Sequence, residues 1–231
     1  MANLDCFVGG VPAGAIFRMD TEDLNDIVIN SSDNGTFNKN AEIAFIALAC
    51  YFEAYFKNQF ASVVNICPSI VENFITKRPE LTIGIKELLL LDFDISNKIG
   101  FLIAEQFDFG TPKVINSLFK DLLLVTPFSK EDTDSYNELL SQRNLLVHHG
   151  GIYTMKYTKQ NFTKEIVRKE AFFNSLIIKK GEFEKWYKFT QGIVKKTDKA
   201  CNAAMKRYVE DSSIVMDEEQ LSTIDALLWN V

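Results

Sequence analysis

The stretch that most constrains the fold is residues 40–64, "NAEIAFIALACYFEAYFKNQFASVV", which contains neither glycine nor proline. Between Ile43 and Phe56, apolar residues occupy nearly every position around a helix, so no broad face is left for solvent. Such a helix belongs in the middle of a bundle or at a subunit interface. Asn40 is a suitable N-cap, and Glu42 lies in the first turn, where the helix dipole favours a carboxylate. We therefore predict a mainly α fold built around this helix.

The rest of the chain adds helices and a short extended region. Thr111 is a good N-cap and precedes Pro112, a residue favoured at the first helical position, so a helix is expected over 113–125. A long amphipathic pattern follows later, with Gly192 as its weak point. We expect a helical bundle with a small extended or β-hairpin insertion: a long helix at 182–210, shorter helices at 67–80 and 95–110, a strand or helix at 81–94, and paired extended segments at 151–163 and 170–181.

Length and composition indicate one globular domain. With 231 residues the chain can bury a large core, and its 19 phenylalanines are expected to fill that core rather than to bind a cofactor. We expect a single domain over 1–231, made of an N-terminal segment of uncertain structure (1–37), a helical core (38–210) and an acidic C-terminal tail (211–231).

Several classes of protein are disfavoured by the sequence. The four cysteines are scattered and the chain has only two histidines, so we expect no metal site and no cofactor. The first residues lack a basic region of the kind that opens a secretory signal, and no segment has the roughly 20 apolar residues of a membrane span. A cytoplasmic location without membrane association is expected. Phosphate-binding loops, dinucleotide fingerprints and the common hydrolase motifs do not occur.

Charge is distributed unevenly along the chain. The net charge is −6, which argues against a general attraction to nucleic acid. Between Gly151 and Arg207, however, the sequence contains fourteen lysines and arginines and five acidic residues, a net charge of +9. The rest of the chain therefore carries a net charge of −15. This basic region could attract a phosphate backbone, or it could simply form solvated helix faces.

The two histidines, His148 and His149, follow Arg143 and Asn144 near the end of a helix predicted over 129–151. Within that helix, Ser135 and Glu138 match the spacing of a capping box, and Gly150-Gly151 is a typical helix end.

Arg143, Asn144 and His148 could together hold one phosphodiester. Asn144 and His148 are only ~40° apart around a helix, and the long arginine side chain can turn toward them. Guanidinium suits phosphate oxygens, and imidazole exchanges protons near neutral pH, so the set suits metal-free RNA cleavage by the neighbouring 2′-hydroxyl. The alternative is a solvated helix end, where the dipole favours histidine.

A second candidate is the pair Asp92 and Asp94, which could hold Mg²⁺ beside a nucleotide if the segment were a strand. No phosphate-binding loop precedes them, and capping of the following helix is the better interpretation.

The segment "RNLLVH" at 143–148 resembles the signature of the HEPN superfamily, helical domains typical of prokaryotic toxins and antiviral nucleases. In that signature an arginine precedes a histidine by four to six residues, and a polar residue often follows the arginine. The early aromatic helix, the "HHGG" continuation and the late basic helix are also similar to these proteins.

The resemblance implies a symmetric homodimer in which two motif helices build one metal-independent ribonuclease site. Arg143 would stabilise the scissile phosphate, Asn144 would orient the phosphate or the histidine, and His148 would act as acid or base, while His149 would assist or face solvent. RNA would be the substrate, and an antitoxin or a defence-system protein a further partner. One subgroup has tyrosine where this chain has Gly150. Some members have lost catalysis, so a non-catalytic module that binds a protein or a nucleotide is the alternative.

Overall fold

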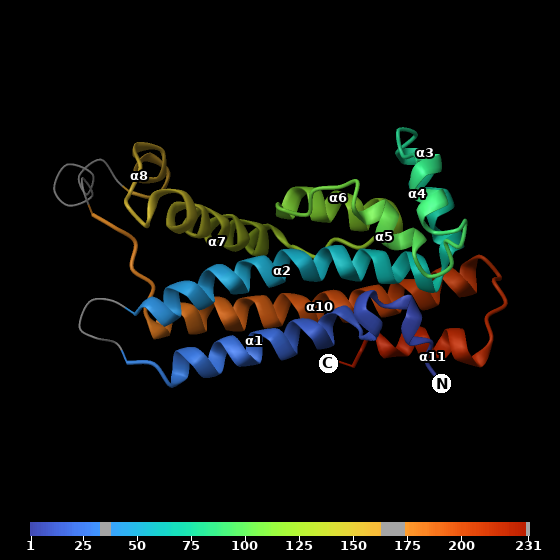
Figure 1. Cartoon of the computed structure of the whole chain (residues 1–231), viewed down its shortest axis with the longest axis horizontal. Coiled ribbons are helices and arrows are strands. Elements are labelled where there is room, and N and C mark those ends of the chain that lie inside the picture. Colours follow the sequence, from blue (N-terminus) through green and yellow to red (C-terminus); the bar gives the residue numbers. More distant parts are fainter. Residues whose placement is uncertain (33–37, 163–173, 230–231) are drawn as a thin grey trace. The chain divides into compact units, whose positions relative to one another are not determined.

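The computed structural model describes residues 1–32, 38–162 and 174–229, and it confirms the mainly α fold (Figure 1). In the described residues, the short 3₁₀ helices are η1 (Leu4–Cys6), η2 (Val8–Gly10) and η3 (Pro68–Ile70), and the α-helices are α1 (Ala13–Ile29), α2 (Lys39–Ile66), α3 (Val71–Lys77), α4 (Ile85–Leu90), α5 (Ile99–Ala104), α6 (Pro112–Leu123), α7 (Lys130–His149), α8 (Met155–Asn161), α10 (Lys180–Asp211) and α11 (Glu218–Ala226).

The chain divides into two compact units. The first unit comprises Met1–Met19, Phe52–Ser129 and Gln191–Val231, and the second comprises Asp20–Tyr51 and Lys130–Thr190. Helices α1, α2 and α10 contribute residues to both units.

Phenylalanine rings from α2 form the centre of the first unit. Phe56 and Phe60 are both fully buried, and both pack edge-on against Phe119 of α6 with ring centroids 6.0 Å apart. Phe60 also packs against Phe74 of α3, with 5.4 Å between the ring centroids. The prediction that phenylalanines fill the core is therefore confirmed for Phe56, Phe60, Phe74 and Phe119.

Polar contacts tie other segments of the first unit to the end of α2. The buried Asn65 side chain accepts a hydrogen bond from the Gly100 amide at 2.8 Å and donates one to the Cys6 carbonyl at 3.1 Å. The backbone of Gly100 lies so close to the Ala61 carbonyl that no side chain would fit between them. One asparagine thus anchors both η1 and α5.

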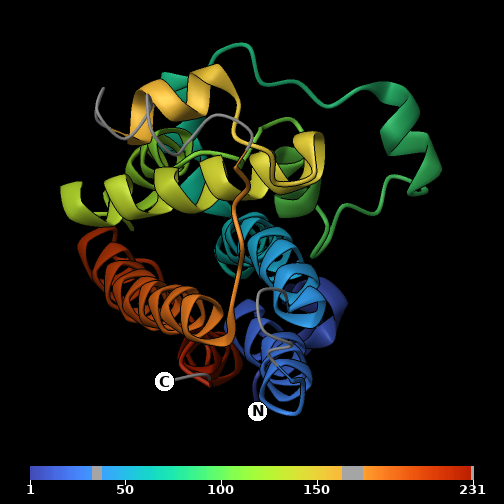
Figure 2. The ribbon, with the colours of Figure 1, turned by 90° about the vertical axis from the view of Figure 1, so that its left-hand side faces the viewer.

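In the second unit, the first half of α2 lies beside α10 (Figure 2). Phe45 packs against the buried Trp186 with ring centroids 6.4 Å apart. The N-cap of α2 is Asn38, whose side-chain oxygen accepts a hydrogen bond from the Ala41 amide at 3.0 Å. The cap therefore lies two residues earlier than predicted, and the assignment of Asn40 as the cap was wrong.

Two other helices match the sequence closely. Thr111 caps α6 by accepting a hydrogen bond from the Val114 amide, and Pro112 is the first helical residue, as predicted. Helix α10 runs without interruption through Gly192, where an added Cβ would meet nothing within 4 Å.

Other predictions were wrong or incomplete. The N-terminal segment contains the 17-residue helix α1, and the acidic tail contains α11, which begins with a capping box formed by Asp217 and Gln220. Helix α7 begins at Lys130, so Ser135 and Glu138 lie inside it and form no capping box. Its first turn instead carries acidic residues, whose negative charge interacts favourably with the positive end of the helix dipole.

The predicted pair of extended segments is largely absent from the described residues. Residues 155–161 form α8, because Thr154 accepts a hydrogen bond from the Tyr157 amide and caps a helical turn. Only an isolated antiparallel bridge joins Ile152 and Ser175, and residues 163–173 lie outside the described ranges. The ambiguous segment 81–94 contains the short helix α4. No helix in the described ranges is both long and apolar enough to cross a lipid bilayer.

Candidate functional site

Helix α7 places the four predicted residues in its last two turns. Asn144, His148 and His149 are exposed, whereas the neighbouring Leu145 and Leu146 are buried. The helix ends in two glycines with left-handed backbone, Gly150 with φ 59° and Gly151 with φ 85°. Their amides donate to the Leu146 and Leu145 carbonyls, both at 3.1 Å, in the pattern of a glycine-terminated helix. The predicted helix end is confirmed.

A hydrogen bond joins the first two residues of the motif. The Arg143 guanidinium donates from Nη1 to the Asn144 side-chain oxygen at 3.0 Å. Arg143 is only half-exposed, and its Nε atom is buried. Since Asn144 and His148 are four residues apart, they share one face of α7, and this hydrogen bond draws the guanidinium toward that face.

Contacts on the opposite side of α7 fix its position in the second unit. The buried indole of Trp186 on α10 donates from Nε1 to the Gln142 side-chain oxygen at 3.1 Å, and Gln142 donates from Nε2 to Glu138 at 3.0 Å. Gln142 directly precedes Arg143, so this pair of contacts orients the turn that carries the motif. Sequence reasoning missed Gln142 and Trp186, because nothing local indicates a contact between residues 44 positions apart.

The segment after α7 folds back close to the helix end. The Gly151 carbonyl accepts from the Leu176 amide at 2.8 Å, and a Cβ at Gly151 would lie 3.1 Å from the Leu176 carbonyl oxygen, so the position requires glycine. Beyond it, the half-buried Tyr153 stacks on Tyr157 with ring centroids 5.3 Å apart and the planes 3° from parallel.

Helix α8 adds positive charge next to these rings. Lys156 and Lys159 are both exposed. Burial, followed by the neighbouring Tyr153, raises the pKa of Tyr157 to about 12, so this tyrosine stays neutral at physiological pH. The aromatic and basic residues of this segment alternate in the sequence, but the segment was predicted to be extended rather than helical.

The basic residues after Gly151 are divided between the two compact units. Lys195, Lys196, Lys199, Lys206 and Arg207 belong to the first unit, whereas α7 belongs to the second. Within the second unit, Lys185 lies 3.6 Å from Glu138, and Lys188 pairs with Glu184. Lys164, Arg168 and Lys169 lie outside the described ranges. Among the described residues between α7 and α10, most of the positive charge therefore lies on α8.

Asp92 and Asp94 lie in a turn that follows α4 rather than on a strand. Asp92 has φ 51°, a left-handed conformation. Asp94 is exposed and accepts hydrogen bonds from Lys98 Nζ at 3.1 Å and from the Ser96 amide at 3.0 Å, and the Lys98 contact is the main cause of its lowered pKa. Because α5 begins at Ile99, Asp94 does not cap that helix, contrary to prediction. Among the described residues, no group of three or more His, Cys, Asp or Glu is placed to hold a metal ion.

Comparison with known proteins gives no relative: no protein-family model, no curated protein and no solved structure matches the chain. The resemblance to HEPN proteins therefore stays a prediction from the sequence motif at 143–148. The local geometry of α7 has to carry any functional argument.

Proposed function

We propose that this protein is a metal-independent endoribonuclease that acts as a homodimer, in the manner of toxin or phage-defence effectors. The observation that carries the proposal is the hydrogen bond from Arg143 to Asn144 on the face of α7 that also bears His148. This part of α7 therefore carries a guanidinium, an amide and an imidazole within little more than one helical turn.

The proposed chemistry uses these groups in separate roles. An imidazole accepts the proton of the RNA 2′-hydroxyl, whose oxygen attacks the adjacent phosphorus. The P–O5′ bond breaks, the 5′-oxygen receives a proton from a second acid, and a 2′,3′-cyclic phosphate remains. Arg143 stabilises the charge that develops on the phosphate oxygens, and Asn144 orients the phosphate.

A homodimer is proposed because one copy of the motif supplies too few groups. His148 and His149 are exposed at the end of α7, where a second copy of the motif could face them across a phosphate. Two copies related by a two-fold axis would place one imidazole on each side of the bond and would exclude water from the phosphate. His148 is the proposed acid or base, and His149 is the residue that could share that task.

The segment that follows α7 supports a single-stranded substrate. Tyr153 offers a ring that is already stacked on one face, and the exposed Lys156 and Lys159 lie on the helix that carries Tyr157. Aromatic rings combined with lysines bind unpaired bases and the phosphate backbone, respectively.

A non-catalytic helical module is the second candidate. It is favoured by the pairing of Lys185 and Lys188 with glutamates. These ion pairs reduce the positive charge available to a long RNA.

Cleavage assays with substituted proteins distinguish the two candidates. We expect His148→Ala to lower the rate of cleavage of single-stranded RNA by about 10²–10⁴-fold, the usual contribution of an acid or base. Arg143→Ala should cost about 10²–10³-fold, since it removes a donor to the developing charge. Asn137→Ala replaces an exposed asparagine on the same helix that is not part of the motif. This control variant should cut at the wild-type rate.

Expression in bacteria provides a second readout. Wild-type protein should arrest growth, and His148→Ala should relieve the arrest at an equal protein level. Wild-type protein that leaves RNA intact, or His148→Ala that cuts at the wild-type rate, would refute the nuclease and leave the binding module.

A further inference from the structure

A cavity of about 640 Å³ lies within the first unit, and its lining contains no residue of α7. Its walls come from the end of α3, from the end of α6 with the residues that follow it, and from one face of α10. This volume is in the range of small-molecule sites, which are typically 300–1,000 Å³.

The walls of the cavity are mainly apolar. On α10, Ala200, Ala203 and Ala204 have the spacing of residues on a single helix face, and their short side chains leave space above the helix. Leu122 and Val125 contribute to the wall formed by the end of α6 and its continuation. An acyl chain or an aromatic ring would find apolar surface on both sides.

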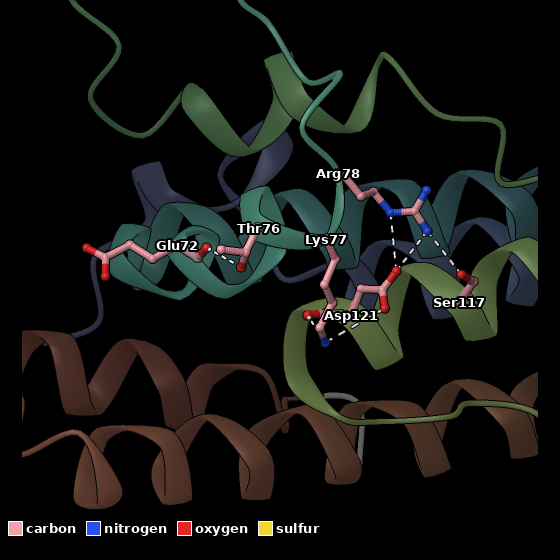
Figure 3. A network of polar contacts seen from close by, with 6 residues as sticks. All are labelled: Glu72, Thr76, Lys77, Arg78, Ser117 and Asp121. Carbon is pink, nitrogen blue, oxygen red and sulfur yellow. Dashed lines mark hydrogen bonds and ion pairs between the residues drawn. The ribbon is translucent and has the colours of Figure 1, made fainter.

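An ion-pair network holds the α3 wall to α6, as Figure 3 shows. Arg78 donates to Asp121 Oδ2 from Nη2 at 2.9 Å and from Nε at 3.2 Å, and Nη2 also contacts the Ser117 hydroxyl at 3.0 Å. Lys77 lies 3.8 Å from the other carboxylate oxygen of Asp121. Both oxygens of this acid are therefore engaged, so Asp121 adds little uncompensated negative charge to the cavity.

The guanidinium of Arg207 is the uncommitted cation of the lining. It extends from the same face of α10 as the three alanines and makes no hydrogen bond or ion pair with any residue that the structure describes. Guanidinium has five donors in a planar fork that matches a carboxylate. An apolar hollow beside an unused fork suits a ligand with an apolar tail and an anionic head.

We propose that this cavity binds a small amphipathic carboxylate. Its tail lies along Ala200, Ala203 and Ala204, and its head is held by Arg207, with Lys77 as a second cation in the lining. Asp211 also lines the cavity and opposes an anion, so it sets a limit on affinity. No residue of α7 lines this cavity, and the proposal does not depend on ribonuclease activity.

Calorimetric titration of the full chain with decanoate tests the proposal. We expect binding of one decanoate per chain, and a cation with a tail of equal length, decyltrimethylammonium, should bind at least about tenfold more weakly. Arg207→Gln should weaken decanoate binding by about tenfold or more, because it removes a charged hydrogen-bond donor. Lys195→Gln, an exposed lysine on the same helix that does not line the cavity, should bind like wild type.

Two further variants test the tail site and the opposing acid. Ala204→Leu fills the cavity and should abolish binding, with Ala203→Leu as a second filling variant if the first lowers the thermal stability. Asp211→Asn should tighten binding. The proposal is overturned if wild-type protein shows no binding at about 1 mM decanoate, if Arg207→Gln binds as tightly as Lys195→Gln, or if the cationic amphiphile binds as well as the carboxylate.

Discussion

The hydroxyl of Tyr55 should contribute strongly to stability because it binds a buried carboxylate. Tyr55 on α2 is 2% exposed and donates to Asp198 on α10, which is 0% exposed, over 2.7 Å. Replacing Tyr55 by Phe keeps the ring and removes this donor from a site that water does not reach. Removing the donor leaves a buried acceptor with one hydrogen bond fewer, which costs about 1–3 kcal/mol, so we expect the free energy of unfolding to fall by that amount.

Urea denaturation followed by far-ultraviolet circular dichroism measures this loss. Tyr51→Phe is the matched control, because the same hydroxyl is removed from the same helix at a residue that is 39% exposed. Its effect should stay within about 0.5 kcal/mol. If Tyr55→Phe costs no more than Tyr51→Phe, the Tyr55–Asp198 contact does not stabilise the fold, and the reasoning from burial is refuted.

Three further predictions concern stability and can be measured by the same method. Gly100→Ala should cost about 1–3 kcal/mol or more, because its Cβ would collide with the Ala61 carbonyl, whereas Gly192→Ala should stabilise α10 by up to about 1 kcal/mol. Asn38→Ala should cost about 1 kcal/mol through loss of the α2 cap, and an unchanged stability would refute that role. Burial, then the nearby Asp198, raises the pKa of Cys201 above its ordinary value of 9.0, so its contribution to stability should be complete below pH 9 and decline as the pH rises above 9. Cys201→Ala should make that decline shallower; an identical slope would contradict the assignment.

The long helices could be predicted from the sequence because their signals are local. Residues 40–64 lack helix breakers and are apolar throughout, and the structure extends this helix only to Lys39–Ile66. The pair Thr111-Pro112 marks a helix start through the cap hydrogen bond and the fixed proline backbone, both of which depend on adjacent residues.

The short helices could not be predicted because their local helix propensity is weak, so a single contact decides whether the segment becomes helical. The segment 151–163 has the isoleucine, tyrosine and threonine content of a strand, yet the Thr154 cap starts a helix within it. The segment before α1 is rich in glycine, which obscured the helical pattern from Ala13 onward. Local sequence is a poor guide where one hydrogen bond selects the conformation.

The residues of the candidate site could be predicted from the sequence, but the contacts that hold them in place could not. Spacing alone placed Asn144 and His148 on one face and Gly150 at the helix end. The contact from Trp186 to Gln142 depends on how α7 packs on α10, which the sequence does not reveal. The hydrogen bond from Arg143 to Asn144 likewise depends on a choice of rotamer.

We propose that RNA cleavage depends on Arg143 and His148 of α7 and requires no metal ion. The decisive measurement is incubation of purified wild-type protein and His148→Ala with single-stranded RNA in excess EDTA, followed by analysis of the fragment ends. Wild-type protein should leave 2′,3′-cyclic phosphate ends, and the variant should leave the RNA intact. Cleavage that stops in EDTA, or fragments with other ends, would refute the proposal.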